Sequence, residues 1–217
     1  MKVNWCRNMK KVISFDLDGT LVQGKFGDMV WHHGIPGKYA EKHDLRLEEA
    51  QRLILKEYET IGDANLLWYD VEYWIAKFDL RLSSHALLDT YVKHIELIPH
   101  ALEVIQALRA RYRLVIASNA ARIFVEKELT QAGLTGYFEY VVSATSDLGM
   151  VKKEERFYHR LAASLGVSLG DLVHVGDHRV FDYEVPRSLG IECYHYNPSG
   201  ETDGTVINDL RELLKRL

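Results

Sequence analysis

Short apolar runs alternate with amphipathic helical stretches through the second half of the chain. The apolar runs show no regular polar alternation, which is typical of strands that are buried on both faces. The helical stretches between them carry apolar positions on one side, and glycine directly follows two of them. This alternation predicts β-α-β units, and therefore a parallel sheet with right-handed crossovers. We predict strands over residues 113–117, 140–143, 172–175 and 191–196, and helices over residues 99–110, 121–132 and 154–165.

A different pattern separates the first apolar strand from this series. Helical periodicity spans residues 47–58 and 84–95, and no convincing strand lies between the two blocks. We therefore predict a small α-helical cap domain over residues 23–97, inserted into a Rossmann-like, doubly wound α/β core over residues 1–22 and 98–217. The aromatic side chains of the insertion predict a small core of its own, with stacking on a nucleobase as the alternative. They are Trp31, Trp68, Tyr69, Tyr73, Trp74 and Phe78.

Composition places the chain among soluble globular proteins. Of its 217 residues, 47% are hydrophobic and 27% are charged, which argues against disorder. A net charge of −4 provides no global field for nucleic acid or for an anionic membrane, so we expect neither as a partner. No apolar run is long enough to cross a bilayer and no signal peptide is recognisable, so we expect a cytoplasmic protein. Cys6 and Cys193 are too few for a disulfide framework or a thiolate metal site.

Two carboxylates follow the first apolar run. The run Val12-Ile13-Ser14-Phe15 leads directly into Asp16-Leu17-Asp18-Gly19. In open α/β sheets, functional groups gather at the carboxyl ends of strands. Two acids this close repel each other, and a divalent cation relieves that repulsion. The segment therefore predicts a metal site, although a strand that ends in an Asp-Gly turn has the same appearance.

Polar residues also follow three later strands, which would end at the same edge of the sheet. Ser118 and Asn119 precede a predicted helix, where they could bind an anion or simply cap the helix. Lys152 lies in the loop after the third strand of the chain order, and such lysines are usually solvated. Asp177 and Asp182 follow the fourth strand after a glycine.

In chain order these strand ends carry Asp-x-Asp-Gly-Thr, then Ser-Asn, then Lys, then Gly-Asp-x-x-x-x-Asp. This order, with a helical insertion between the first and second motifs, resembles the haloacid dehalogenase superfamily. The match covers all four motifs and most of the chain outside the predicted cap. The resemblance implies a Mg²⁺-dependent phosphatase that acts on a small phosphorylated metabolite through an aspartyl-phosphate.

The resemblance also implies roles for the polar residues. Asp16 would be the nucleophile, and Asp18 would protonate the leaving oxygen and later deprotonate water. Lys152 would neutralise the nucleophile and the phosphoryl group, which Ser118 and the backbone around Asn119 would also bind. Lys152 is followed by a second lysine instead of the usual proline, so Lys153 remains the alternative. Mg²⁺ would be held by the Asp16 carboxylate, the Asp18 backbone carbonyl and Asp177, with Asp182 orienting this set.

Other functions remain open on the sequence. Dehalogenation is disfavoured, because the dehalogenases that resemble this chain lack the second carboxylate, here Asp18. A phosphomutase is disfavoured because residues 23–31 do not resemble the corresponding mutase stretch. A catalytically idle binding or interaction module of the same fold is the main alternative. The sequence is silent on oligomeric state, so a monomer or a small homo-oligomer is expected. Candidate substrate contacts, each with a solvated surface residue as the alternative, are Lys25, His32, His33, Lys38, Arg46 and His178.

Overall fold

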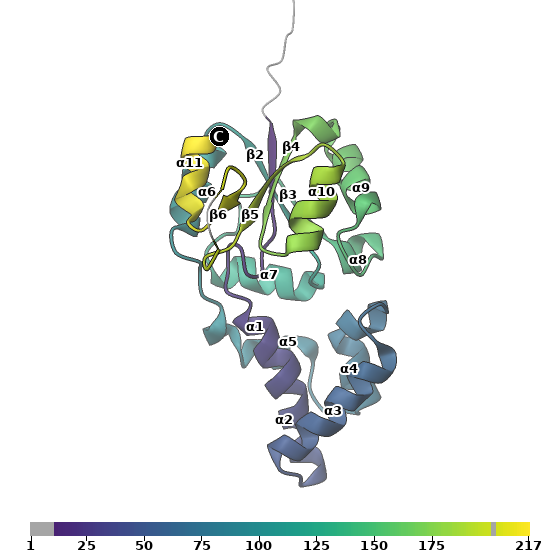
Figure 1. The fold of residues 1–217 in the computed structure, drawn as a ribbon. Helices are drawn as coiled ribbons and strands as arrows, with labels where there is room; N and C mark the ends of the chain where they lie inside the picture. Colours follow the sequence, from purple (N-terminus) through teal and green to yellow (C-terminus); the bar gives the residue numbers. More distant parts are fainter. Residues whose placement is uncertain (1–10, 201–202) are drawn as a thin grey trace, which may run out of the picture.

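A six-stranded parallel sheet forms the centre of the molecule (Figure 1). The computed structural model describes residues 11–200 and 203–217; Cys6 and the first part of the predicted core segment 1–22 lie outside the described residues. The strand order is β3-β2-β1-β4-β5-β6, so the N-terminal strand lies inside the sheet. The strands are β1 (Val12–Phe15), β2 (Arg113–Ser118), β3 (Tyr140–Ser143), β4 (Leu172–Gly176), β5 (Glu192–Tyr196) and β6 (Val206–Ile207).

The register brings the carboxyl ends of the inner strands to one level. Phe15 at the end of β1 lies opposite Ile116 of β2 and Val175 of β4. Ser118 of β2 lies opposite Ser143, which ends β3. The segments that leave these strands therefore meet at a single edge, as the sequence predicts.

Helices cover both faces of the sheet, which confirms the doubly wound α/β fold. On one face, Ile13 and Phe15 pack in a core with α6, α7 and α11. On the other face, Val12 packs in a second core with α9 and α10. The alternation of side chains along β1 assigns Ser14 and Asp16 to the same face as Val12. The helices are α6 (Ala101–Arg109), α7 (Arg122–Gln131), α8 (Ala144–Leu148), α9 (Glu155–Leu165), the 3₁₀ helix η4 (Leu169–Asp171), the π-helix η5 (Arg179–Glu184), α10 (Val185–Ser188), the 3₁₀ helix η6 (Leu210–Glu212) and α11 (Leu213–Arg216).

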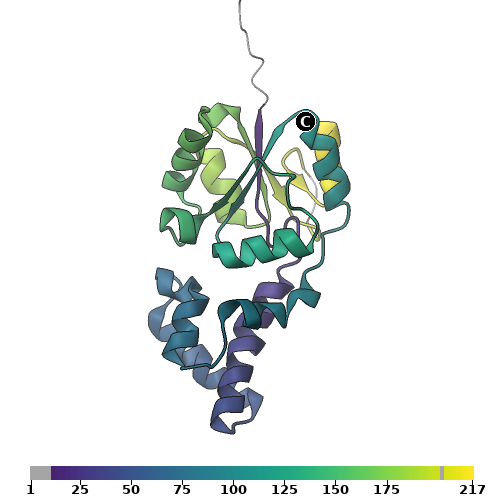
Figure 2. The same cartoon turned by 180° about the vertical axis from the view of Figure 1, so that it is seen from behind.

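A block of helices lies between β1 and β2 in the sequence and below the carboxyl edge of the sheet in both views (Figures 1 and 2). The Gln23 N–H donates to the Glu96 carbonyl (2.9 Å), so the two chain segments that connect block and sheet lie side by side. No helix in the described part of the chain is long and apolar enough to span a membrane. The block contains α1 (Lys25–Met29), the π-helix η1 (Val30–Gly34), α2 (Ile35–His43), α3 (Leu47–Ile61), the 3₁₀ helix η2 (Leu66–Tyr69), α4 (Val71–Lys77), α5 (Ser84–Asp89) and the 3₁₀ helix η3 (Val92–His94).

Two details of this block differ from the sequence prediction. The predicted helix over residues 84–95 is divided into α5 and η3, because the chain tightens into turns whose hydrogen bonds span three residues, such as Tyr91 N–H to the Leu88 carbonyl (2.9 Å). The aromatic side chains do not form a separate core. Trp31 stacks on Phe124 of α7, with ring centroids 5.5 Å apart, and Trp74 belongs to the same continuous cluster as the sheet residues.

Candidate active site

Asp16 leaves the end of β1 and lies in a nearly closed environment. Its N–H donates to the Val175 carbonyl (2.8 Å), which continues the pairing of β1 with β4 by one residue. Its neighbour Leu17 is fully buried, so the apolar and the charged side chain alternate as the sequence predicts. Burial raises the pKa of Asp16 well above its usual range, and the nearby Lys153 charge opposes that rise. Asp16 is therefore a carboxylate whose charge depends on its neighbours.

Lys153, and not Lys152, contacts Asp16. Its ammonium donates to Asp16 Oδ1 and to the Ala117 carbonyl (2.9 Å), and it lies 2.6 Å from Asp182 Oδ1. The Lys153 side chain is 1% exposed. Burial disfavours its charge, but Asp16 and Asp182 outweigh burial and raise the pKa of Lys153. This lysine is therefore held as a cation between two carboxylates.

Lys152 points elsewhere, so the sequence preference for it is corrected. Its ammonium lies 3.8 Å from Asp63 and 5.3 Å from the centre of the Tyr69 ring, and 28% of the side chain is exposed. Adjacent side chains outside a helix leave the backbone in different directions, so only one lysine of the pair can enter the core. Both lysines satisfy the same sequence pattern, and only the packing before α9 distinguishes them.

Three carboxylates meet at the edge of β1 and β4. One oxygen from each of Asp16, Asp177 and Asp182 lies within 4.8 Å of the others. Burial and the nearby Asp182 charge raise the pKa of Asp177. Gly19 adopts φ +77°, and a Cβ there would collide with the Asp177 carboxylate, so the glycine is required for this approach. The carboxylate of Asp18 is not part of this group, and its predicted contribution is the backbone carbonyl.

Asp182 is fixed by a buried network that the sequence analysis did not single out. Despite burial, Lys153 and His174 hold the pKa of Asp182 below its usual range. His174 Nε2 lies 3.0 Å from Asp182 Oδ1, and its Nδ1 lies 2.8 Å from Ser14 Oγ. Burial lowers the pKa of His174, so we assign a neutral ring that donates from Nε2 and accepts from Ser14. The sequence signal for this network is a polar residue inside each of two otherwise apolar strands, Ser14 in β1 and His174 in β4.

Asp18 has a buried acidic neighbour that was also missed. Glu128 of α7 is fully buried. Burial raises the pKa of Asp18, and the Glu128 side chain beside it partly offsets that rise. Both carboxylate oxygens of Glu128 are buried and have no hydrogen-bond partner in the described part of the chain. Burial and the Asp18 charge raise the pKa of Glu128 well above its usual range. The buried setting therefore favours a proton held between these two acids. Within a predicted helix, one glutamate among several gives no sign that it faces inward.

Ser118 and Asn119 occupy the turn that follows β2. Ser118 is buried, and its Oγ accepts from the Ala120 N–H (3.1 Å). Asn119 Oδ1 is buried and has no hydrogen-bond partner within the described residues. Neither side chain caps α7, because the N–H of Arg122 at the start of that helix donates to Ser146 Oγ instead (2.9 Å). The turn therefore brings polar groups to the end of β2, the strand beside β1 and Asp16.

Three further candidates from the sequence, His178, Lys38 and Arg46, have structural partners. His178 Nδ1 accepts from the N–H groups of Val180 and Phe181 (3.2 Å each), which caps η5. Lys38 and Arg46 form exposed ion pairs within their own helices or turns. None of these contacts involves the carboxylate cluster. These three side chains are therefore solvated or structural residues, which is the alternative to a substrate contact.

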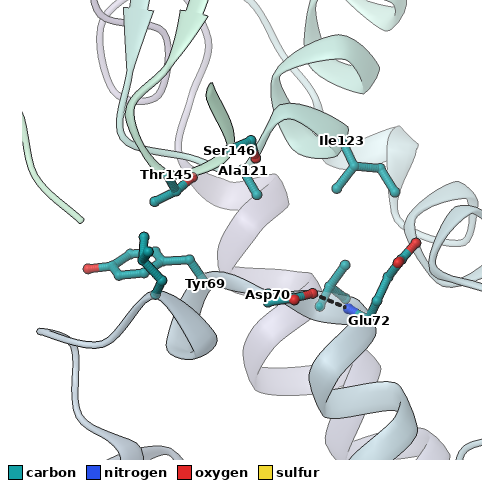
Figure 3. Close-up of a pocket in the computed structure, with 9 residues that line it drawn as sticks. Tyr69, Asp70, Glu72, Ala121, Ile123, Thr145 and Ser146 are labelled. Atoms are coloured by element: carbon teal, nitrogen blue, oxygen red, sulfur yellow. Dashed lines mark hydrogen bonds between the residues drawn. The ribbon is translucent and has the colours of Figure 1, made fainter. Parts of the chain in front are cut away.

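A pocket of about 390 Å³ lies between the helical block and the loops after β2 and β3 (Figure 3). Tyr69, Asp70 and Glu72 form its lower side in this view, and Thr145 and Ser146 lie across from them. Its size lies within the range of small-molecule sites. The residues that line it are Leu66, Tyr69, Asp70, Val71, Glu72, Ala121, Ile123, Thr145 and Ser146.

Comparison with known proteins identifies the relatives of this chain. A family model described as haloacid dehalogenase-like hydrolase matches residues 10–190. A HAD phosphatase structure from Thermococcus onnurineus is 27% identical with a TM-score of 0.79, covering 94% of this chain and 96% of that one. The GMP/IMP nucleotidase YrfG of Escherichia coli is 22% identical over 82% of this chain and 78% of its own length. A ribulose-1,5-bisphosphate 5-phosphatase of Halopiger xanaduensis is 26% identical over 57% and 52%, respectively.

Proposed function

The chain belongs to the haloacid dehalogenase-like hydrolases, and we propose that it is a Mg²⁺-dependent phosphatase that hydrolyses phosphate esters of small metabolites. The observation that carries this proposal is the buried contact of Asp16 with Lys153 beside Asp177 and Asp182. Relatives that are named as a nucleotidase and a sugar bisphosphate phosphatase support a phosphate ester as the substrate.

The carboxylate cluster fits Mg²⁺. Its donors are oxygen atoms from Asp16, Asp177 and Asp182, which are the hard ligands that Mg²⁺ prefers. Burial and mutual repulsion raise the pKa of both Asp16 and Asp177, and a divalent cation would relieve this repulsion. We propose that Asp16, Asp177 and the Asp18 carbonyl hold the ion, with Asp182 orienting the set. When bound, Mg²⁺ supplies positive charge that helps neutralise the phosphoryl group.

The reaction that we propose has two steps. The Asp16 carboxylate attacks phosphorus and forms an aspartyl-phosphate, while the bond from phosphorus to the ester oxygen breaks. Asp18 protonates that leaving oxygen. Asp18 then takes a proton from water, which attacks phosphorus, releases inorganic phosphate and restores Asp16. In the transition state of each step, negative charge is spread over the phosphoryl oxygens, so cationic and N–H groups around them lower the barrier.

Neighbouring groups support this reaction without reacting. Lys153 neutralises charge on Asp16 and on the transferred phosphoryl group. Ser118 and the backbone of the turn at Asn119 bind the remaining phosphoryl oxygens. The unpaired Asn119 Oδ1 is itself an acceptor, so it requires a donor such as water and does not bind the phosphoryl oxygens directly. We further propose that residues 23–97 act as a cap that excludes water, while residues 1–22 and 98–217 form the catalytic core.

Phosphate release tests the proposed function. A panel of aryl phosphate, sugar monophosphates and nucleoside monophosphates is incubated with the protein, with Mg²⁺ or with a chelator. We expect release with Mg²⁺, no release with chelator, and no release by Asp16→Asn. Lys77→Ala is the matched control, because Lys77 pairs with Glu57 on the helical block. Absence of release from every compound would favour the alternative of a non-catalytic binding module.

A further inference from the structure

We propose that the pocket in Figure 3 receives the leaving group of the substrate, and that it selects a neutral group rich in hydroxyl or amino donors over one that carries a second phosphate. This inference rests on the proposed phosphatase function and deepens it. The leaving group would be a nucleoside or an uncharged sugar, and both share the chemistry that the pocket recognises.

The position of the pocket links it to the proposed phosphoryl site. Ala121 in its wall is three residues from Ser118, and Thr145 follows the end of β3. Neighbouring strands lie about 5 Å apart, so a wall at the end of β3 lies about 10 Å from the end of β1 at Asp16. This separation matches the length of a nucleoside or sugar that is attached to a phosphoryl group at Asp16.

The charge of the pocket disfavours a second phosphate. Two carboxylates, Asp70 and Glu72, belong to its wall, whereas none of its nine lining residues is a lysine or an arginine. Arg122 begins the helix beside the pocket, but its guanidinium pairs with Asp147 and donates to the Val141 carbonyl (3.0 Å). A phosphate dianion in this pocket would therefore meet like charge and no pocket cation.

The same carboxylates suit hydrogen-bond donors on a ligand. Asp70 Oδ1 accepts hydrogen bonds from the N–H groups of Glu72 (2.9 Å) and Tyr73 (3.1 Å). Glu72 uses Oε1 to accept from Ser84 Oγ (3.1 Å). The second oxygen of each carboxylate accepts no hydrogen bond within the described part of the chain, so it is available to a hydroxyl or amino group.

The walls between these polar groups are apolar and aromatic. Leu66, Val71 and Ile123 provide apolar surface, and the Tyr69 ring faces Thr145 across the pocket in Figure 3. A ring of a sugar or a base fits such a site, since its faces contact apolar side chains while its edges donate to the carboxylates.

A second hollow of about 700 Å³, which has two basic lining residues, offers the opposite selectivity. Its charged lining residues are Lys152, Arg156 and Glu154, and it shares Leu66 with the pocket. Lys152 lies 3.8 Å from Asp63, so part of its charge is already matched. A substrate with two phosphates would use this hollow, and such a use would overturn the proposal.

The test compares matched monophosphates and bisphosphates. One pair is a nucleoside 5′-monophosphate and its 3′,5′-bisphosphate, and the other is a hexose 6-phosphate and its 1,6-bisphosphate. Within the pair that the protein hydrolyses better, we expect kcat/KM for the monophosphate to exceed that for the bisphosphate by at least about tenfold. One like-charge contact between the second phosphate and a pocket carboxylate has about this effect. The pair with the higher kcat/KM distinguishes a nucleoside from a sugar as the source of the leaving group.

Conservative variants locate the selectivity in the pocket. Asp70→Asn with Glu72→Gln removes both charges and keeps an acceptor for the α4 cap and for Ser84. We expect the monophosphate preference to fall by about tenfold through a lower KM for the bisphosphate. Glu59→Gln on α3, which does not line the pocket, should leave the preference unchanged.

Each outcome separates the inference from the proposed function. Absence of Mg²⁺-dependent release from all four compounds would contradict the phosphatase itself. Release with a bisphosphate preference that falls in Lys152→Gln would retain the phosphatase and overturn the pocket assignment. A preference that the double variant and Glu59→Gln change equally would also overturn it. The ratio measured for the unaltered protein remains decisive even where the double variant folds poorly.

Discussion

Replacement of Lys153 by methionine tests the centre of the structure. The ammonium of Lys153 lies between Asp16 and Asp182 with a side chain that is 1% exposed. Methionine keeps much of the buried volume and removes the charge, so two buried carboxylates face each other without their cation. Removal of one partner from a buried ion pair destabilises proteins by about 3–5 kcal/mol.

The matched variant is Lys152→Met. Lys152 is 28% exposed and its ammonium lies 3.8 Å from a carboxylate that is 72% exposed, so its loss should change the free energy of unfolding by at most about 1 kcal/mol. For a chain of this size, the Lys153 variant should lower Tm by about 6–20 °C, and the Lys152 variant by no more than about 4 °C.

Denaturant unfolding in chelator measures both variants without interference from Mg²⁺. The same proteins are then assayed for phosphate release below their transition temperatures, where Lys153→Met should lose turnover and Lys152→Met should retain it. Equal destabilisation by the two changes, or loss of turnover only in Lys152→Met, would refute the assignment of Lys153 to the site.

Three further outcomes follow from the same contacts. His174→Phe removes the donor to Asp182 and should lower Mg²⁺ affinity by about 10–100-fold, with partial recovery in His174→Gln, as measured by metal titration. Burial raises the folded-state pKa of Glu128, so this group loses stabilising free energy as pH rises above its unfolded pKa near 4.5. Glu128→Gln should therefore match the original protein at pH about 4 and be more stable than it at pH about 7 in denaturant unfolding. Mg²⁺ at about 100 times its Kd should stabilise the protein by about 2.7 kcal/mol, and Asp177→Asn should abolish this gain in thermal melts. An unchanged metal affinity in His174→Phe, a pH-independent effect of Glu128→Gln, or a full Mg²⁺ effect in Asp177→Asn would contradict the respective contact.

The sheet was predictable because buried parallel strands leave a simple pattern in the sequence. The predicted strand over residues 140–143 is β3 itself, and the predicted helix over residues 154–165 differs from α9 by one residue. β6 was not predicted, since two residues are too few to show a period. Parallel topology then brings the strand ends to one edge, so the proximity of Asp16 and Asp177 follows from the order of the elements.

The details that the sequence missed depend on tertiary packing. Lys152 and Lys153 are chemically identical, and the direction in which each side chain leaves the loop decides which one is buried. Glu128 becomes distinctive only because its side of α7 faces Asp18. Trp31 joins the main core only because the helical block packs against α7. None of these relations has a fixed spacing along the chain.

The phosphorylation state of Asp16 during turnover tests the central claim most directly. The protein is mixed with its best substrate and Mg²⁺, quenched in acid within the first turnovers and digested, and the peptide that contains Asp16 is analysed by mass spectrometry. The account predicts one phosphoryl group on Asp16 in the unaltered protein and none in Asp16→Asn, which should also release no phosphate. A phosphoryl group on a different residue, or normal phosphate release by Asp16→Asn, would contradict it.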